Sequence, residues 1–373
     1  MAKKSLITID GVYRKNKKCF VTVGKIHRKL KKAFLTIGSV YRPCWSGGEL
    51  QYYGFLNNTL TVTQKNDYSA GSNENFAFFT SSASTVDAFD TSLTKHSAPN
   101  LYTRAHKATT TLGDNVIFAG GDDNSSATTQ ATFSIRAIDS DFTVTTMTNL
   151  NDGRGMIAPA TLDDLALFCG GYGAATGYSE CLDVYNSDLT KYTAKDMPTR
   201  GQYSGDSVGN YAVFYNEFNN GTYENKMYSI DSDLTISLSS LSFTTAKRDV
   251  AAKTIGDFIM FAGGRNTKNN AVYKTVTAIN SDLTMLSGIT SLSESRYSMA
   301  KTTLDDYILF IGGISSSNNQ TNIVDVYDKD LTKIIDDTLV LQQAKGYEYC
   351  ATSVGKYALC TQGYVGTIEA FVA

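Results

Sequence analysis

The stretch Ile230-Asp-Ser-Asp-Leu-Thr235 decides the fold, because five close copies of it recur along the chain. The apolar residue at the fifth position of these six phrases falls at 93, 142, 189, 234, 283 and 331, so successive copies lie 49, 47, 45, 49 and 48 residues apart. Repeats of about 20–50 residues are typical of solenoids and propellers, which stack one structural unit many times. The recurrence therefore predicts a repeat architecture for most of the 373-residue chain.

A second phrase, which is apolar throughout, also recurs. Six of its copies end about 28 residues after the fifth-position residue of a recurring phrase, and one further copy precedes the first recurring phrase. Its seven copies occupy residues 76–79, 116–121, 165–171, 211–215, 258–264, 307–313 and 357–360. Short runs of aromatic and branched residues predict strands that are buried on both faces. Four of the copies end in a pair of glycines, which predicts close approach of another backbone at the strand end.

Each repeat carries signals for four strands. A run of small residues, such as 108–111 or 251–254, precedes the apolar strand, and a tight turn of Gly, Asn or Asp joins the two. A third strand ends in the recurring phrase, and a fourth follows it, as at 331–335. Four strands in about 47 residues predict a propeller blade, whose innermost strand needs small side chains near the axis. The expected fold is all-β, with seven blades.

The two ends of the array predict closure of the ring. Residues 367–373 supply a third strand without a fourth, whereas residues 50–54 lie where a fourth strand is missing. We expect residues 51–54 to pair with residues 367–371, because this pairing leaves no open sheet edge.

The glycine pairs and the later Tyr-Asp or Tyr-Asn of each unit resemble the kelch repeat over residues 50–373. Kelch units usually carry a Trp in the fourth strand, and the one Trp of this chain, Trp45, lies outside the array. The resemblance is therefore to a diverged, kelch-like propeller. It implies a fold and no particular function, since one fold hosts many functions.

The composition, with 42% hydrophobic and 19% charged residues, fits a soluble globular chain. No apolar run reaches membrane-spanning length, and the first ten residues lack the apolar core of a signal peptide, so we expect neither membrane insertion nor a secretion signal. The six cysteines are scattered, which favours buried thiols over a disulfide framework.

The N-terminal segment differs chemically from the rest. Residues 1–48 hold twelve Lys or Arg and one acid, a charge of +11, while the remainder holds 22 basic and 35 acidic residues, a charge of −13. The segment also repeats with a period of 14: residues 7–20 align with residues 21–34 and then with 35–45. Each copy has two strand-like pieces around a glycine and then a basic stretch. We expect a basic β-repeat module at 1–46, a linker at 47–49 and the propeller at 50–373.

Three roles are open for this basic segment: docking to protein, binding to nucleic acid, or a flexible arm. Docking to protein is favoured, because the apolar and aromatic residues repeat in a register that a flexible arm does not require. The repeats, which close with Tyr41-Arg-Pro-Cys-Trp-Ser-Gly-Gly48, resemble N-terminal repeats of tail-associated structural proteins from phages and prophages of Gram-positive bacteria. The attachment residues that we would expect are Arg14, Lys17, Lys18, Arg28, Lys31, Lys32, Arg42 and Trp45.

This resemblance implies a virion component, present in several copies per particle and made in the host cytoplasm. Other virion proteins would be the partners of residues 1–46. The position on the particle and the receptor stay open.

Enzymatic signals are weak. The three histidines, at 27, 96 and 106, recur in no pattern, and no nucleophile or phosphate-loop motif is present. The phrase Ser-Asp-Leu-Thr resembles a sialidase Asp-box turn faintly, but it lacks the following Gly and Trp. The paired acids Asp139/Asp141 and Asp231/Asp233 could suggest calcium, yet side-chain capping of a turn accounts for them better. We expect no catalytic residue, no metal and no cofactor.

An arginine recurs just before the innermost strand in five of the seven units: Arg104, Arg154, Arg200, Arg248 and Arg296. Such a ring could bind an anion or an acidic glycan near the axis. The favoured alternative is that each guanidinium ties neighbouring blades together through backbone carbonyls.

The connections from second to third strands vary most between units, and in a propeller they all emerge on one face. They are rich in Asn, Ser, Thr and Tyr, which is the chemistry of polar recognition surfaces. The ligand-binding residues that we predict there are Tyr172, Tyr178, Asn219, Asn220, Tyr223, Arg265, Asn266 and Asn318. Plain solvated loops are the alternative.

These observations lead to one favoured function and two alternatives. The favoured hypothesis is a non-enzymatic virion protein whose loop face binds a host-surface glycan or protein. The first alternative is a structural decoration without a ligand, and the second is a glycan-active propeller enzyme.

Overall fold

The computed structural model describes residues 20–23, 26–29, 33–37, 40–45, 50–55, 61–63, 69–122, 131–173, 177–345, 350–361 and 366–373. The chain divides into two compact units, Met1–Leu50 with Ala373, and Gln51–Val372. All regular structure in the described ranges is β. These ranges contain no helix that is long and apolar enough to cross a membrane.

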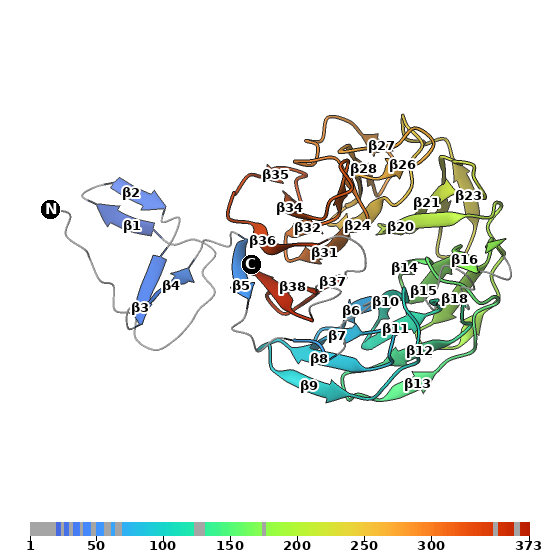
Figure 1. The fold of residues 1–373 in the computed structure, drawn as a ribbon, viewed down its shortest axis with the longest axis horizontal. Coiled ribbons are helices and arrows are strands. Elements are labelled where there is room, and N and C mark those ends of the chain that lie inside the picture. Colours follow the sequence, from blue (N-terminus) through green and yellow to red (C-terminus); the bar gives the residue numbers. More distant parts are fainter. Residues whose placement is uncertain are drawn as a thin grey trace. The chain divides into compact units, whose positions relative to one another are not determined.

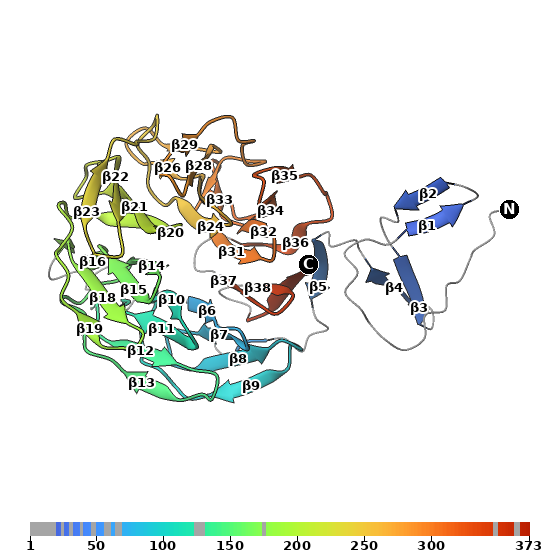
Figure 2. The same cartoon turned by 180° about the vertical axis from the view of Figure 1, so that it is seen from behind.

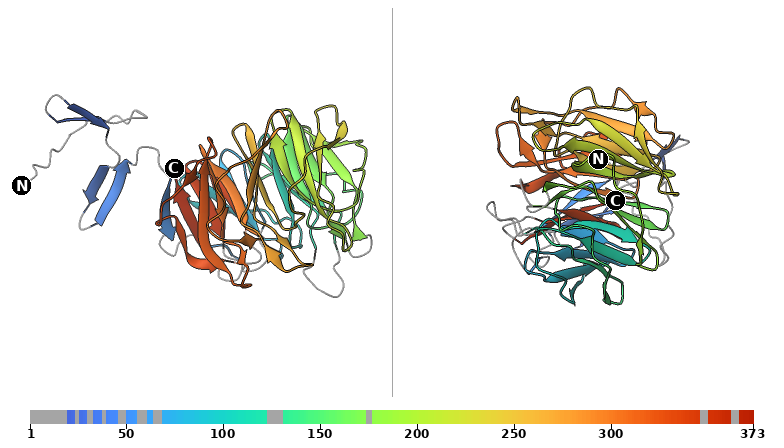
Figure 3. Two further views of the ribbon diagram at one scale, coloured as in Figure 1. Left: turned by 90° about the horizontal axis from the view of Figure 1, so that it is seen from above. Right: turned by 90° about the vertical axis from the view of Figure 1, so that its right-hand side faces the viewer.

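The larger unit is a ring of seven four-stranded antiparallel sheets, which we call blades 1 to 7 (Figure 1). The same ring is seen from behind in Figure 2 and from two further sides in Figure 3. The all-β, seven-bladed fold expected from the repeats is confirmed.

The strands of the first four blades are β6 (Ser69–Ser72), β7 (Phe76–Thr80), β8 (Val86–Asp90) and β9 (Lys95–Ala98); β10 (Ala108–Leu112), β11 (Asn115–Ala119), β12 (Ile135–Ile138) and β13 (Val144–Thr146); β14 (Ala158–Leu162), β15 (Leu165–Cys169), β18 (Leu182–Asn186) and β19 (Lys191–Tyr192); β20 (Gln202–Val208), β21 (Tyr211–Phe218), β22 (Lys226–Ile230) and β23 (Ile236–Ser239). Those of the last three blades are β24 (Ala251–Ile255), β25 (Phe258–Ala262), β28 (Val276–Asn280) and β29 (Met285–Leu286); β31 (Ala300–Leu304), β32 (Tyr307–Ile311), β34 (Thr321–Asp328) and β35 (Lys333–Ile334); β37 (Ala351–Val354), β38 (Tyr357–Thr361), β39 (Ile368–Val372) and β5 (Gln51–Phe55).

Further short strands extend the blades. Within blade 6, β36 (Val340–Lys345) also pairs with β34. Three two-stranded ladders join β16 (Tyr172–Gly173) to β17 (Gly177–Tyr178), β26 (Arg265–Asn266) to β27 (Ala271–Val272), and β30 (Arg296–Tyr297) to β33 (Ile314–Ser315).

The ring closes through the two ends of the array. β5 is the fourth strand of blade 7 and pairs with β39, with Gly54 opposite Ala370 and Tyr52 opposite Phe371. The pairing expected from the sequence ends is therefore confirmed. It gives the last blade the same four-stranded sheet as the others and removes a free ladder edge.

The hydrophobic core lies between adjacent blades. Along β15, Leu167 and Cys169 pack with residues of blade 4, whereas Ala166 and Phe168 pack with residues of blade 2. Second strands thus bury both faces, which is why they read as continuous apolar runs. The expectation drawn from those runs is confirmed.

The innermost strands join the blades through a recurring hydroxyl. In all seven blades, the first-strand residue that pairs with the second residue of the second strand is a Ser or Thr: Ser72, Thr111, Thr161, Ser207, Thr254, Thr303 and Ser353. The Thr111 hydroxyl donates to the Ser72 carbonyl at 2.6 Å, and the Thr161 hydroxyl to the Thr111 carbonyl at 2.8 Å. Ser207 and Thr254 continue the series, each donating to the preceding blade. Small polar residues near the axis therefore bond blade to blade.

The recurring phrase forms the turn between third and fourth strands. In blade 4, one carboxylate oxygen of Asp231 accepts hydrogen bonds from the amides of Asp233 at 3.1 Å and Thr235 at 2.9 Å. The apolar residue at the fifth position, Leu234, has a φ of 60° and packs against the interblade core. Turn capping, the favoured explanation of the acidic phrase, is confirmed. No group of three metal-ligating side chains occurs in the described ranges.

One glycine pair shows why the second strands end where they do. Gly120 and Gly121 have φ values of 62° and 107°, and a Cβ on Gly120 would lie 2.3 Å from the carbonyl oxygen of Arg154 in the next blade. The Gly121 amide donates to that carbonyl at 2.9 Å. The close approach of backbone predicted at this position is confirmed.

In the smaller unit, only four strands are described, and only by their backbone. β1 (Phe20–Val23) pairs with β2 (Ile26–Lys29), and β3 (Ala33–Ile37) pairs with β4 (Val40–Trp45). In the sequence, one glycine of the 14-residue period lies between the two strands of each pair. Of the predicted attachment residues, Arg28 lies in β2, and Arg42 and Trp45 lie in β4; Arg14, Lys17, Lys18, Lys31 and Lys32 lie outside the described residues.

Candidate ligand-binding face

The variable connections emerge at one end of the ring, which we call the loop face. Backbone bridges join a residue three positions before a first strand to a residue three positions after the second strand, as in Gly155 with Tyr172 and Arg248 with Arg265. First strands therefore begin, and second strands end, at this same face.

A row of packed aromatic rings crosses blades 3 and 4 on the loop face. The ring centroids of Tyr172 and Tyr178 lie 5.0 Å apart, those of Tyr178 and Phe218 5.7 Å, and those of Phe218 and Tyr223 5.1 Å. All four side chains are half-buried. Edge-to-face aromatic pairs contribute about 0.5–1.5 kcal/mol each beyond their buried area, so the row is held in one arrangement.

Two arginines continue this row onto blades 5 and 6. The guanidinium carbon of Arg248 lies 4.8 Å from the Phe218 ring centroid, and that of Arg265 lies 4.2 Å from the Tyr297 centroid. Asp249 lies between them and accepts from Nε of Arg265 at 2.6 Å and of Arg248 at 3.4 Å. We call the set Tyr172, Tyr178, Phe218, Tyr223, Arg248, Arg265 and Tyr297 the belt.

Polar groups border the belt on its outer side. The Tyr223 hydroxyl lies 3.0 Å from the Thr267 hydroxyl and accepts the Thr267 amide at 2.6 Å. The Tyr297 hydroxyl donates to the side-chain oxygen of exposed Asn318 at 3.2 Å. Tyrosine, arginine and asparagine are thus linked by contacts over four blades, although Tyr297 itself is buried.

The structure brings five of the eight predicted ligand residues into or against the belt: Tyr172, Tyr178, Tyr223, Arg265 and Asn318. Asn266 is turned to the backbone, because its side-chain amide donates to the Ala246 carbonyl at 3.0 Å. Asn219 and Asn220 form the tip of the β21 hairpin, where Asn219 pairs with Thr222 and Asn220 has a φ of 42°.

Three residues of the belt escaped the sequence-based prediction: Phe218, Arg248 and Tyr297. Phe218 lies on the loop face because β21 continues beyond the point where the other second strands end. The register of its hairpin places Asn216 and Glu217 at the positions of Gly170 and Gly171 in blade 3. The missing glycine pair in blade 4 was the signal that could have revealed this extension.

Beneath the belt, Glu217 is fully buried. Its carboxyl oxygens accept from the Ser204 hydroxyl at 2.6 Å and from the amides of Asp249 and Val250, both at 3.0 Å. Burial, and after it the negative charge of Asp249, raise the pKa of Glu217 to about 7. Burial also raises the pKa of the Tyr178 hydroxyl in the belt above it.

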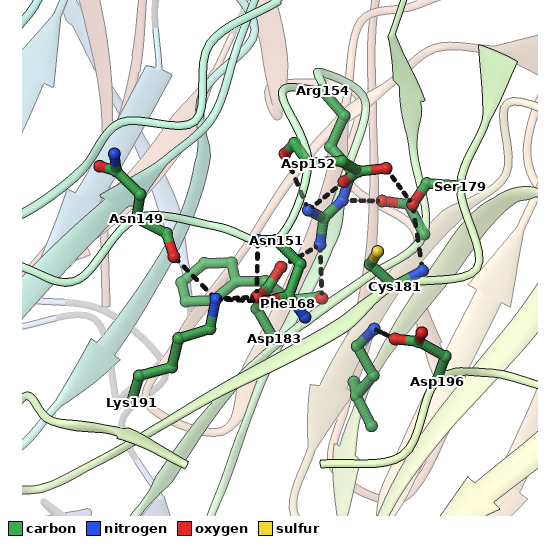
Figure 4. Close-up of polar contacts among 12 residues, drawn as sticks. Asn149, Asn151, Asp152, Arg154, Phe168, Ser179, Cys181, Asp183, Lys191 and Asp196 are labelled. Atoms are coloured by element: carbon green, nitrogen blue, oxygen red, sulfur yellow. Dashed lines mark hydrogen bonds and ion pairs between the residues drawn. The ribbon is translucent and has the colours of Figure 1, made fainter. Parts of the chain in front are cut away.

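The recurring arginines do not share one environment, and Arg200, for example, is 55% exposed and pairs with Glu180. Arg154 is fully buried in blade 3 and donates to Asp183 at 2.7 Å, to the Gly170 carbonyl at 2.7 Å and to the Phe168 carbonyl at 3.2 Å (Figure 4). Lys191 bonds the other Asp183 oxygen at 2.6 Å. Arg296 is likewise buried in blade 6, where it bonds Asp325.

These carbonyls belong to the arginine's own blade, so the expectation that the guanidinium ties neighbouring blades is wrong for Arg154. Arg154 and Arg296 are also enclosed and cannot join a ring around the axis. In blade 5 the third strand has Thr277 where blade 3 has Asp183, and there the equivalent Arg248 lies in the belt instead.

Comparison with protein-family models found no match, and comparison with curated proteins found none either. Among solved structures, that of YjhT is similar, with a TM-score of 0.57 at 13% sequence identity, over 74% of this chain and 98% of that chain. A likeness at this identity supports the propeller fold and nothing about ligand or activity.

Proposed function

We propose that this chain is a non-enzymatic, kelch-like virion protein of a phage, whose loop face binds a host-surface glycan or protein and whose residues 1–46 dock it to the particle. A glycan is the favoured ligand. The belt is the observation that carries this proposal. It is the part of the loop face where flat rings, guanidinium groups and amides lie together in fixed positions.

The chemistry of the belt suits a sugar. Tyrosine rings offer flat, amphipathic contact area at low conformational cost, and Arg and Asn donors suit hydroxyl groups. The rings of Tyr178, Phe218 and Tyr223 already pack against one another, so little side-chain freedom is lost on binding. Several copies on one particle would add avidity to weak single contacts.

Binding without catalysis is the favoured form of this proposal, although one residue has an enzyme-like property. A carboxyl group with a pKa of about 7, as Glu217 has, is suited to general acid or base chemistry. Its side chain is fully buried, however, and its oxygens already accept three hydrogen bonds from the protein. Enclosure of this kind favours a structural role beneath the ligand face.

The virion assignment is supported by the N-terminal resemblance and by the charge contrast of +11 against −13 between residues 1–48 and the remainder. A chain that begins at Gly47 should keep the propeller and fail to enter particles. Incorporation at the normal level would refute docking through residues 1–46. Strong, salt-dependent DNA binding by the isolated segment would favour the nucleic-acid alternative instead.

The binding proposal is tested by replacing Tyr178, Phe218 and Tyr223 together with Ala. Tyr192→Ala is the matched control, since Tyr192 is 52% exposed on a fourth strand outside the belt. Purified chains are assayed for binding to host cell walls and to a glycan panel, with circular dichroism to verify folding. We expect the triple variant to lose binding and the control to retain it. Equal binding by both folded variants would remove the belt as a receptor site and favour a decoration without a ligand.

A further inference from the structure

The first strands of the seven blades enclose a channel of about 540 Å³ along the axis of the ring. Its lining is mostly Gly, Ala, Ser and Thr, as the repeat requires near the axis. Three consecutive blades depart from this pattern: Asp206 on β20, Lys253 on β24 and Lys301 on β31 all line the channel. Charged residues at positions that elsewhere hold small ones need an explanation beyond packing.

The charges in the channel do not cancel. The Lys253 ammonium bonds the Asp206 carboxylate at 2.8 Å, and the same carboxylate oxygen accepts the Thr254 amide at 3.1 Å. The Lys301 side chain is exposed to the channel, and it makes no hydrogen bond or ion pair with the parts of the chain that the structure describes. Two lysines and one aspartate therefore leave one positive charge in excess.

The other ionisable groups near the channel are already engaged. The Lys107 ammonium is directed away, onto the Ser81 carbonyl at 2.9 Å, and His106 at the mouth lies 3.0 Å from Asp122. Glu217, whose charge also acts on Lys301, accepts three protein hydrogen bonds. None of these groups neutralises the excess charge by direct contact.

A second polar group in the lining is also unsatisfied. Thr109 on β10 lines the same channel, and its buried hydroxyl has no hydrogen-bond partner among the described residues. A buried hydroxyl without an acceptor is destabilising. The channel thus offers the Lys301 ammonium group and, in its wall, one hydroxyl, that of Thr109, without an acceptor.

We infer that the channel binds a small oxyanion of the phosphate class at Lys301. A compact ammonium and several hydroxyls suit the oxygens of such an ion, and the channel is large enough to hold it with water. The channel walls displace water around Lys301, and this desolvation, followed by the charge of Lys253, lowers the pKa of Lys301. A bound anion would offset both effects and stabilise the folded ring.

The test uses the full-length chain and inorganic phosphate at pH 7, by isothermal titration calorimetry and thermal melting, with sodium chloride at equal ionic strength as reference. We expect saturable one-to-one binding and a phosphate-dependent rise in Tm. Lys301→Gln should weaken binding at least about tenfold, and Lys301→Arg should retain it because the charge is kept. Lys356→Gln, on an exposed hairpin turn, should bind like the native chain.

Two results would overturn the inference. One is the absence of saturable phosphate binding by the native chain. The other is binding by folded Lys301→Gln equal to that of Lys356→Gln, which would show that the excess channel charge is irrelevant. Neither result depends on the belt or on the glycan, so this site can fail while the proposed function stands.

Discussion

Replacing Glu217 with Gln should remove a specific pH dependence from the stability of the ring. The folded protein raises the pKa of Glu217 from an ordinary 4.5 to about 7, so it binds the proton more tightly than the unfolded chain does. The stabilisation from this group is therefore fully present below pH 4.5 and is lost as the pH rises through 7. The difference between these two pKa values corresponds to about 3 kcal/mol of unfolding free energy.

Urea denaturation between pH 5 and pH 8 measures this effect. Relative to Glu217→Gln, the native chain should lose about 2–3 kcal/mol over that range, whatever the absolute cost of the substitution, because the other titrating groups are shared. Glu224→Gln is the control, since Glu224 lies nearby and only half-buried, paired with Lys226 at 2.8 Å. Parallel pH profiles for the native chain and Glu217→Gln would show that this carboxyl is charged when folded, and the reasoning would fail.

Three further predictions concern the ring itself. Asp183→Asn should lower the unfolding free energy by about 3 kcal/mol, because it removes the fully buried carboxylate that pairs with both Arg154 and Lys191, leaving Arg154 with Asp152 alone among the described carboxylates; Asp188→Asn in the exposed turn should cost under about 0.5 kcal/mol, and equal denaturation midpoints would contradict this. Removal of residues 367–373 should lower Tm sharply or prevent folding, because blade 7 loses β39 and its buried Phe371; an unchanged Tm would count against closure. Thr161→Val should cost about 1–2 kcal/mol by breaking the hydroxyl bond to blade 2, and an unchanged urea midpoint would exclude that bond as a stabilising contact.

The repeat and its turns were accessible from sequence because their causes are local. The carboxylate of Asp231 caps amides only two and four residues ahead, and the apolar second strands are buried on both faces in every blade. The six copies of the phrase, spaced 45–49 residues apart, and the seven apolar second-strand runs together give the number of blades without any long-range information. Closure of the ring could be predicted as well, because the C-terminal unit lacks a fourth strand and residues 50–54 supply one.

The environments of the recurring arginines could be predicted from the sequence only in part. Asp183 and Lys191, like Asp87 and Lys95 or Asp325 and Lys333, lie eight residues apart in blades 3, 1 and 6. Blades 2, 4 and 5, which also have a complete third and fourth strand, lack this Asp–Lys pair. The difference can be seen in the sequence once the pairing is known. Without the structure, nothing indicated that Arg154 is buried with Asp183 in blade 3. Nor did anything indicate that Arg248 lies on the loop face in blade 5, where the third strand lacks this acid.

The sequence by itself thus determined the architecture: seven four-stranded blades, their turns, their closure and the face on which the variable connections lie. Only the tertiary structure decided which side chains meet there. Phe218 and Arg248, or Asp206 and Lys253, are 30 and 47 residues apart and come together because neighbouring blades stack around the axis. Contacts between blades depend on the stacking of whole sheets, and such contacts leave no periodic pattern within a single repeat.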